Sequence, residues 1–275
     1  MKGPIIIFAS VCIASAGFVA WRVHAMRRHT VNHYALVYDP SLSFTGGCQA
    51  LVGTAENIFH NSGISADSTL TVLALGDAST ADEPRRLAEY TIPLARKVIE
   101  GRQASVERRE RVLKDLRARC HSLRPTLVTP IYLGVQQALA DLRARGCKTG
   151  SQCGLWVASD LEENADRSIE ARLRGYRKSK APLPRMLDNR GTRVTFCGYA
   201  QTAGRIVGTS GREIGKAVIR DPHRDDRLQA VWRSLFTQSE LVRFEPYCPA
   251  PSNREVRGMT ARSKNRGIAN GRDQN

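Results

Sequence analysis

An acid and two hydroxyl residues at alternate positions are the most chemically informative feature of this 275-residue sequence. Asp39, Ser41 and Ser43 belong to the pentapeptide DPSLS, which directly follows the apolar run HYALVY at positions 33–38. At the end of a strand, such residues can direct several oxygen atoms toward one hard cation. A pattern this short occurs by chance in very roughly one chain in ten or twenty of this length. Its meaning therefore depends on residues further along the chain.

Two more oxygen-bearing residues, Thr129 and Asp160, lie beside predicted elements. Thr129 stands at the start of a predicted helix, and Asp160 ends the apolar segment GLWVAS. In a doubly wound sheet of strand order 3-2-1-4-5-6, ligands bind at the carboxyl ends of the first and fourth strands. Since Asp39 ends the first strand and Asp160 the fourth, we expect Asp39, Ser41, Ser43, Thr129 and Asp160 to surround one crevice. Such an all-oxygen set suits Mg²⁺ or Mn²⁺, and without histidine or thiolate it does not suit zinc.

Strands and helices alternate along the rest of the chain, as the hydrophobic periodicity indicates. The predicted strands are 34–39, 69–75, 89–93, 154–159, 192–199 and 241–247, and the predicted helices are 47–61, 105–120, 129–145, 163–174 and 226–239. We expect the third strand at an edge because Pro93 cannot donate to a ladder. The stretches 179–190 and 201–225 are expected as surface loops or insertions. The alternation predicts an α/β fold with a doubly wound, mostly parallel six-stranded sheet and helices on both faces.

These pieces together resemble the von Willebrand factor type A (vWA) domain. The resemblance rests on DPSLS at 39–43, on TPIYLGVQQAL from Thr129 and on LWVASD ending at Asp160, and it extends from Asn32 to Cys248. In that family the three pieces form the metal-ion-dependent adhesion site, so the resemblance implies a vWA-like or Rossmann-like fold and a bound Mg²⁺ or Mn²⁺.

The resemblance also implies a role for each residue of the site. Ser41 and Ser43 would coordinate the cation directly, and Thr129 would do so in the ligand-bound form. Asp39 and Asp160 would act largely through water and through hydrogen bonds to the serines. The family usually has glycine after the fourth-strand acid, whereas this sequence has Leu161.

The chemistry implied by the resemblance is recognition of a protein, in which a partner's Asp or Glu carboxylate fills the remaining position on the cation. A metal-dependent phosphohydrolase is the less favoured reading. Phosphatases of the haloacid dehalogenase type carry a second Asp two residues after the nucleophilic one, and here that position is Ser41. The sequence therefore predicts a binding module and not an enzyme.

The first thirty residues predict attachment to a membrane. Residues 3–20 are uncharged and apolar, and Trp21 and several arginines follow. This length is near the minimum for a spanning helix, with an aromatic residue at the interface. The alternative is a cleaved signal peptide, with small-residue sites at 14–16 or 23–25. We favour an uncleaved anchor over residues 1–29.

Two signals disagree about the side of the membrane on which the domain lies. The arginines after the apolar stretch favour a cytoplasmic location. However, six cysteines lie beyond the anchor, an even number that is high for a reducing compartment. Cys147 and Cys153 flank a short loop that a disulfide could close, and the alternative is ordinary buried thiols. We favour an extracytoplasmic, periplasmic location.

The formal net charge is +16, part of which lies in the final segment, residues 250–275. That segment lacks apolar periodicity and is predicted to be a disordered basic tail, so residues 30–249 form the predicted vWA-like domain. A basic protein can bind nucleic acid or an anionic surface, and this is the alternative function. The basic helix 105–120 has acids interleaved with its arginines and no aromatic platform, so nucleic acid is not the expected partner.

Overall fold

The computed structural model describes residues 32–60, 68–76, 83–91, 102–126, 128–148, 153–174, 184–200, 203–207, 213–218 and 222–251. The predicted anchor, residues 1–29, and nearly all of the predicted basic tail lie outside these ranges. Within the described ranges, no helix combines the length and the apolar character needed to cross a bilayer.

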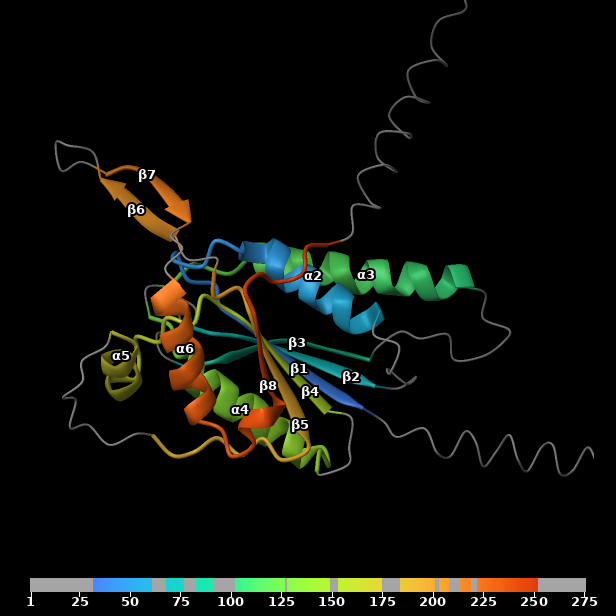
Figure 1. Ribbon diagram of the computed structural model, residues 1–275. Coiled ribbons are helices and arrows are strands. Elements are labelled where there is room, and N and C mark those ends of the chain that lie inside the picture. The colour runs from blue at the N-terminus through green and yellow to red at the C-terminus, as the bar shows by residue number, and fades with distance from the viewer. Residues whose placement is uncertain are drawn as a thin grey trace, which may run out of the picture.

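A six-stranded sheet forms the centre of the fold, in the order β3-β2-β1-β4-β5-β8 (Figure 1). Its strands are β1 (His33–Tyr38), β2 (Thr69–Ala74), β3 (Arg85–Thr91), β4 (Cys153–Ala158), β5 (Thr192–Cys197) and β8 (Val242–Glu245). All neighbouring pairs are parallel except β2 and β3. The predicted doubly wound α/β fold is therefore confirmed, with β1 and β4 side by side as expected.

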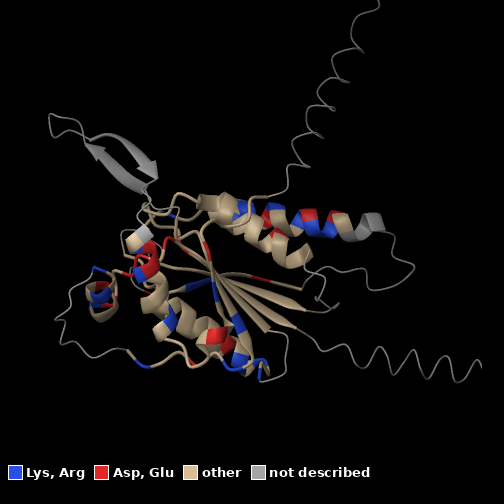
Figure 2. Cartoon of the chain, viewed as in Figure 1, with Lys and Arg blue, Asp and Glu red and all other residues tan. Residues whose placement is uncertain are grey.

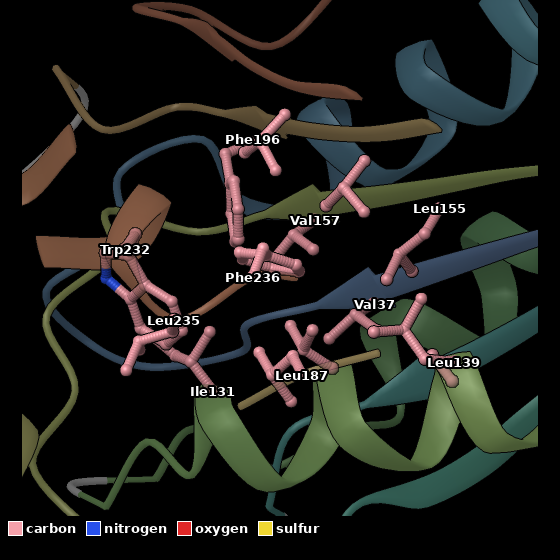
Figure 3. Close-up of a cluster of buried hydrophobic side chains, with 14 of the residues drawn as sticks. Val37, Ile131, Leu139, Leu155, Val157, Leu187, Phe196, Trp232, Leu235 and Phe236 are labelled. Atoms are coloured by element: carbon pink, nitrogen blue, oxygen red, sulfur yellow. The ribbon is translucent and has the colours of Figure 1, made fainter. Parts of the chain in front are cut away.

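Helices cover both faces of this sheet (Figure 1). One face carries α2 (Gly47–His60) and α3 (Arg102–His121), and the other carries α4 (Ile131–Ala144), α5 (Arg167–Leu173) and α6 (Pro222–Ser234). Successive residues of β1 face opposite sides, so Leu36 packs in the core beneath α2 while Val37 packs in the core beneath α4. Figure 3 shows the latter core, in which Trp232 of α6 and Leu235, just after this helix, lie near Ile131 of α4.

Several predicted boundaries were wrong. The predicted helix 163–174 begins only at Arg167, because the Asp166 carboxylate caps it by accepting the Ser168 and Ile169 N–H groups. The helix predicted from Thr129 begins at Ile131, and the helix predicted over 226–239 runs from Pro222 to Ser234.

Strand predictions also needed correction. The edge strand predicted at 89–93 lies earlier, at Arg85–Thr91, and it is antiparallel to β2; Pro93 lies outside the described residues. The stretch 201–225, expected as a surface loop or insertion, contains a separate two-stranded hairpin of β6 (Ala203–Val207) and β7 (Glu213–Val218), as well as the start of α6.

The six cysteines of the described chain form three disulfides. Cys48–Cys120 joins α2 to α3, Cys147–Cys153 joins the end of α4 to β4, and Cys197–Cys248 joins the end of β5 to the segment after β8. The segment after β8 also packs closely on α2, because a Cβ atom at Gly53 would overlap the Pro249 carbonyl oxygen.

Gly53→Ala tests this packing. Alanine is the better helix former by about 1 kcal/mol, but its Cβ would overlap the Pro249 carbonyl oxygen. We expect a net loss of about 1–3 kcal/mol in the free energy of unfolding and a melting temperature lower by several degrees. Gln49→Ala, at an exposed position of the same helix, is the control and should be nearly neutral. Equal or higher stability of Gly53→Ala would show that the segment after β8 is not fixed there.

Candidate cation-binding site

The register between β1 and β4 brings the first acid of the site into the sheet centre. Tyr38 is aligned with Ala158, and the next residue, Asp39, donates its N–H to the Ala158 carbonyl at 3.0 Å. Asp39 is fully buried. Its Oδ1 accepts the Ser41 N–H at 2.8 Å, and its Oδ2 accepts the Ser159 hydroxyl at 2.7 Å. Both carboxylate oxygens are thus held in fixed positions by the ends of the two strands.

The two serines of the pentapeptide point to the same place. The Ser41 and Ser43 hydroxyl oxygens lie 3.1 Å apart, and the Ser43 side chain also hydrogen-bonds the Asp160 carboxyl. The structure therefore brings together four of the five predicted residues, Asp39, Ser41, Ser43 and Asp160, through direct contacts.

Asp160 is the least satisfied group of the site. Its Oδ1 accepts the Glu162 N–H at 3.2 Å, whereas its buried Oδ2 has no hydrogen-bond partner among the described residues. Burial, followed by repulsion from Asp39, raises the Asp160 pKa to about 7. Burial likewise raises the Asp39 pKa, against the hydrogen bonds from Ser159 and Ser41.

The fifth predicted residue, Thr129, is also buried and lies next to the loop that follows Asp160. Its N–H donates to Asn164 Oδ1 at 2.6 Å. The neighbouring Glu163 is buried as well, and its carboxylate accepts the N–H groups of Tyr132, Ala165 and Asp166. Burial raises the Glu163 pKa to about 7 despite these three bonds. Direct coordination by the Thr129 hydroxyl stays a prediction.

Leu161, where the vWA family usually has glycine, adopts the left-handed conformation that glycine favours, with φ of 65°. Two hydrogen bonds hold it there. Its N–H donates to Ser159 Oγ at 3.0 Å, and its carbonyl accepts the Trp232 indole N–H at 3.2 Å. The side chain is fully buried in the core beneath α4. The turn after Asp160 therefore has a glycine-like backbone, stabilised by burial of a leucine.

Sequence reasoning missed three residues that build this site: Ser159, Glu163 and Asn164. Ser159 could have been found, because the residue after Ala158 in β4 must lie beside the residue after Tyr38 in β1. Glu163 and Asn164 gave no signal beyond being polar residues after a strand. Their side chains accept the N–H groups of Tyr132 and Thr129, at and just before the start of α4.

The site opens into a cavity of about 430 Å³ between the strand ends and the helices α5 and α6. Ser41, Leu42 and Ser43 line one side of it. The remaining lining residues are Thr126, Glu162, Glu163, Asn164, Glu170, Leu173, Arg174, Arg224, Arg227 and Leu228. The serine hydroxyls are therefore within reach of a ligand in the cavity.

The donor set fits a hard divalent cation. Two buried carboxyls repel each other, one oxygen has no hydrogen-bond partner among the described residues, and two hydroxyls converge beside it. A divalent cation would neutralise the pair and use the orphaned oxygen, directly or through water. Within the described ranges, no three His, Cys, Asp or Glu side chains cluster as a metal site, so most ligands would be hydroxyls and water.

Comparisons with known proteins assign the chain to no family. No protein-family model matches it, and no curated protein matches it. Among solved structures, it is similar to an aerotolerance-related membrane protein from Bacteroides fragilis, at 10% identity and a TM-score of 0.37, over 86% of this chain and 98% of the other.

Two other solved structures are similar at the same level. Proximal thread matrix protein 1 from the mussel byssus has 13% identity and a TM-score of 0.36, over 84% of this chain and 44% of the other. A von Willebrand factor type A protein from Catenulispora acidiphila has 10% identity and a TM-score of 0.34, over 75% of this chain and 43% of the other. Such low values establish no family membership, so the fold class rests on the strand order of the sheet.

The raised pKa values predict how stability depends on pH without metal. A carboxyl with a higher pKa in the folded state, as for Asp160 at about 7 against 3.8, binds its proton more tightly when folded. The free energy of unfolding should therefore fall as the pH rises from about 4 to above 7. In EDTA, we expect the wild type to melt at a lower temperature at pH 8 than at pH 5.5. Millimolar Mg²⁺ should reverse this loss at pH 8 and have little effect at pH 5.5.

Asp160→Asn is the matched variant, because it keeps the side-chain shape and removes the titrating group. In EDTA at pH 8 it should be more stable than the wild type, and Mg²⁺ should raise its melting temperature little. A variant that is less stable at pH 8, or that keeps the full response to Mg²⁺, would contradict this assignment of the buried charge.

Proposed function

We propose that this chain is a vWA-type binding module that holds Mg²⁺ or Mn²⁺ at Asp39, Ser41, Ser43, Thr129 and Asp160 and binds a protein partner through an acidic side chain. The observation that carries the proposal is the buried Asp160 Oδ2, which has no hydrogen-bond partner in the described part of the chain, together with the two converging serine hydroxyls. A cation held mostly by neutral hydroxyls and water keeps its attraction for an incoming carboxylate. The cavity beside Ser41 and Ser43 gives such a carboxylate a path to it.

The hydrogen bonds of Asp39 favour binding over catalysis. A nucleophile or general base needs a carboxylate oxygen that is free to approach the substrate. Both Asp39 oxygens instead accept hydrogen bonds from neighbouring groups, and the residue is fully buried. Asp39 is thus suited to hold Ser41 and Ser159 in place. A phosphohydrolase that uses Asp39 as nucleophile is disfavoured for this reason.

Nucleic-acid binding is also disfavoured by the charge distribution. Figure 2 shows acidic and basic positions interleaved along α3. Several arginines are engaged in ion pairs, including Arg119 with Asp115 at 2.8 Å and Arg145 with Glu89 at 2.8 Å. Three acids interrupt the basic residues of α3, so the helix presents no unbroken row of cations to a phosphate backbone.

We also propose that the domain lies on the extracytoplasmic side of a membrane, attached by the apolar segment 3–20. The pairing of all six described cysteines supports an oxidising compartment. The same pairing weakens the alternative of a cytoplasmic domain, which the flanking arginines favoured.

Metal binding is tested directly by replacing both serines. Ser41→Ala together with Ser43→Ala removes two oxygens and keeps the hydrogen bond from the Ser41 N–H to Asp39 Oδ1, because that bond uses the Ser41 backbone. We expect calorimetry to detect weak Mg²⁺ and Mn²⁺ binding to the wild type and at least a tenfold loss in the double variant. The circular dichroism spectrum should not change. The control is Ser122→Ala with Ser234→Ala, two exposed serines elsewhere. Equal metal affinity in the double variant and the wild type would rule out this site.

The disulfides are tested by peptide mapping of protein purified from its native membrane under alkylating, non-reducing conditions. We expect the pairs Cys48–Cys120, Cys147–Cys153 and Cys197–Cys248. Reduction should lower the melting temperature, because the first pair closes a loop of 72 residues and such a cross-link contributes about 4 kcal/mol in the chain-entropy model. Six alkylated thiols would remove the support for an extracytoplasmic location.

A further inference from the structure

The cavity beside the cation site has a second wall that the proposed function does not use. Its volume of about 430 Å³ falls within the range of small-ligand pockets. One wall carries the serine hydroxyls at the strand ends, and the other is formed by α5 and α6, with Arg174, Arg224 and Arg227. A ligand group at the serines therefore has basic side chains in the same cavity.

Two of these arginines already have carboxylate partners. Arg224 donates two hydrogen bonds to Glu162 Oε1, at 3.1 and 2.6 Å, and Arg174 forms an ion pair with Glu170 at 2.6 Å. The third acid of the lining, Glu163, is buried and is used by three backbone N–H groups. The acids of the cavity are thus occupied within the protein.

Arg227 is different. Its guanidinium donates to the Leu173 carbonyl at 3.4 Å, and it is in no ion pair with a described acid. The residue is exposed and lines the cavity from α6. A guanidinium bonded once, to a neutral carbonyl, keeps donors for a further acceptor, and a carboxylate is the acceptor whose geometry matches it best. Among the described arginines of this wall, Arg227 is therefore the one whose side chain has no carboxylate partner.

Aliphatic side chains line the cavity between the two polar walls. Leu42 lies between the two serines in sequence and is 52% exposed. Leu173 and Leu228 line the opposite helices. The cavity thus combines a cation site, an aliphatic surface and an arginine.

We infer that the partner segment presents two carboxylates, one to the cation at Ser41 and Ser43 and a second to Arg227, with their aliphatic stems against Leu42 and Leu228. This inference rests on the proposed function, and it narrows the ligand from a single acid to an acidic peptide with two closely spaced Asp or Glu residues. The second carboxylate forms a partly exposed pair, for which about 1 kcal/mol, or about fivefold in affinity, is expected.

Three tetrapeptides test the inference by titration with NMR detection, in millimolar Mg²⁺ and in EDTA. Acetyl-Ala-Glu-Ala-Ala-amide carries one acid, and acetyl-Ala-Glu-Glu-Ala-amide and acetyl-Ala-Glu-Ala-Glu-amide carry two at different spacings. In Mg²⁺, we expect at least one diacid peptide to bind the wild type about fivefold more tightly than the monoacid. In Arg227→Gln this affinity ratio should fall to about two, the statistical advantage of offering two acids to one cation.

Two variants keep the test specific to Arg227. Arg227→Lys retains the charge without the bidentate geometry and should give an intermediate ratio. Arg172→Gln removes the same charge from an exposed position of α5 that does not line the cavity, and it should keep the wild-type ratio.

The outcomes separate the two proposals. A monoacid that binds only with Mg²⁺, with no gain beyond about twofold for either diacid or with a gain of about fivefold that persists in Arg227→Gln, would overturn this inference and leave the proposed function standing. Peptide binding that EDTA does not weaken, or no binding of any peptide in Mg²⁺, would overturn the proposed function and this inference with it.

Discussion

The constraint on which this structure depends is the burial of two carboxyls, Asp39 and Asp160, at the ends of adjacent parallel strands. Both are inaccessible to solvent, and among the described residues no basic side chain offsets the rise in either pKa. Burying a charge without a counter-charge costs several kcal/mol, more than the surrounding hydroxyls and N–H groups return. A proton or a cation must therefore supply the rest of the stabilising free energy. The doubly wound topology creates this problem, since it places β1 beside β4, and the serines of the following loop provide the groups that could hold a cation there.

The central fold was predictable because its signals are local and mutually consistent. In β1, Leu36 and Val37 pack into the cores on opposite faces of the sheet. A strand buried on both faces needs a continuous apolar run, whereas a strand with one face in water alternates apolar and polar residues. The strand order then followed from one topological rule, and it placed Asp39 and Asp160 together correctly.

The boundary at Arg167 was not predictable in the same way. It depends on Asp166 capping α5 and on Glu163 using its carboxylate for three N–H groups, and both residues look like ordinary helix-favouring acids in the sequence. The hairpin β6–β7 was missed because its short strands lack the apolar runs of the core.

The disulfide between Cys197 and Cys248 lies close to the same edge of the sheet. The Ser159 N–H donates to the Cys197 carbonyl at 3.0 Å, so the end of β5 and the Asp39 network share a residue. The Cys197 sulfur also lies 3.8 Å from the Thr54 hydroxyl of α2. The disulfide therefore restrains the end of β5, which borders β4 on the side opposite to β1. A site that must keep two carboxyls close against their repulsion benefits from such restraint, because freedom of the strand ends would let the pair separate.

The turn at Leu161 connects this electrostatic problem to the core and to the cavity. A non-glycine residue in the left-handed region costs about 1–2 kcal/mol, and here burial of the leucine and the two hydrogen bonds offset that cost. The Leu161 N–H donates to Ser159, whose hydroxyl in turn donates to Asp39, and the Leu161 carbonyl accepts the indole N–H of Trp232 in α6. The same helix carries Arg224 and Arg227 at the cavity. Because one turn is bonded to both, the carboxyl pair and the arginine wall cannot shift independently without breaking a buried hydrogen bond. In the proposed complex, the distance between a cation at the serines and a carboxylate at Arg227 would therefore depend on the packing of Trp232.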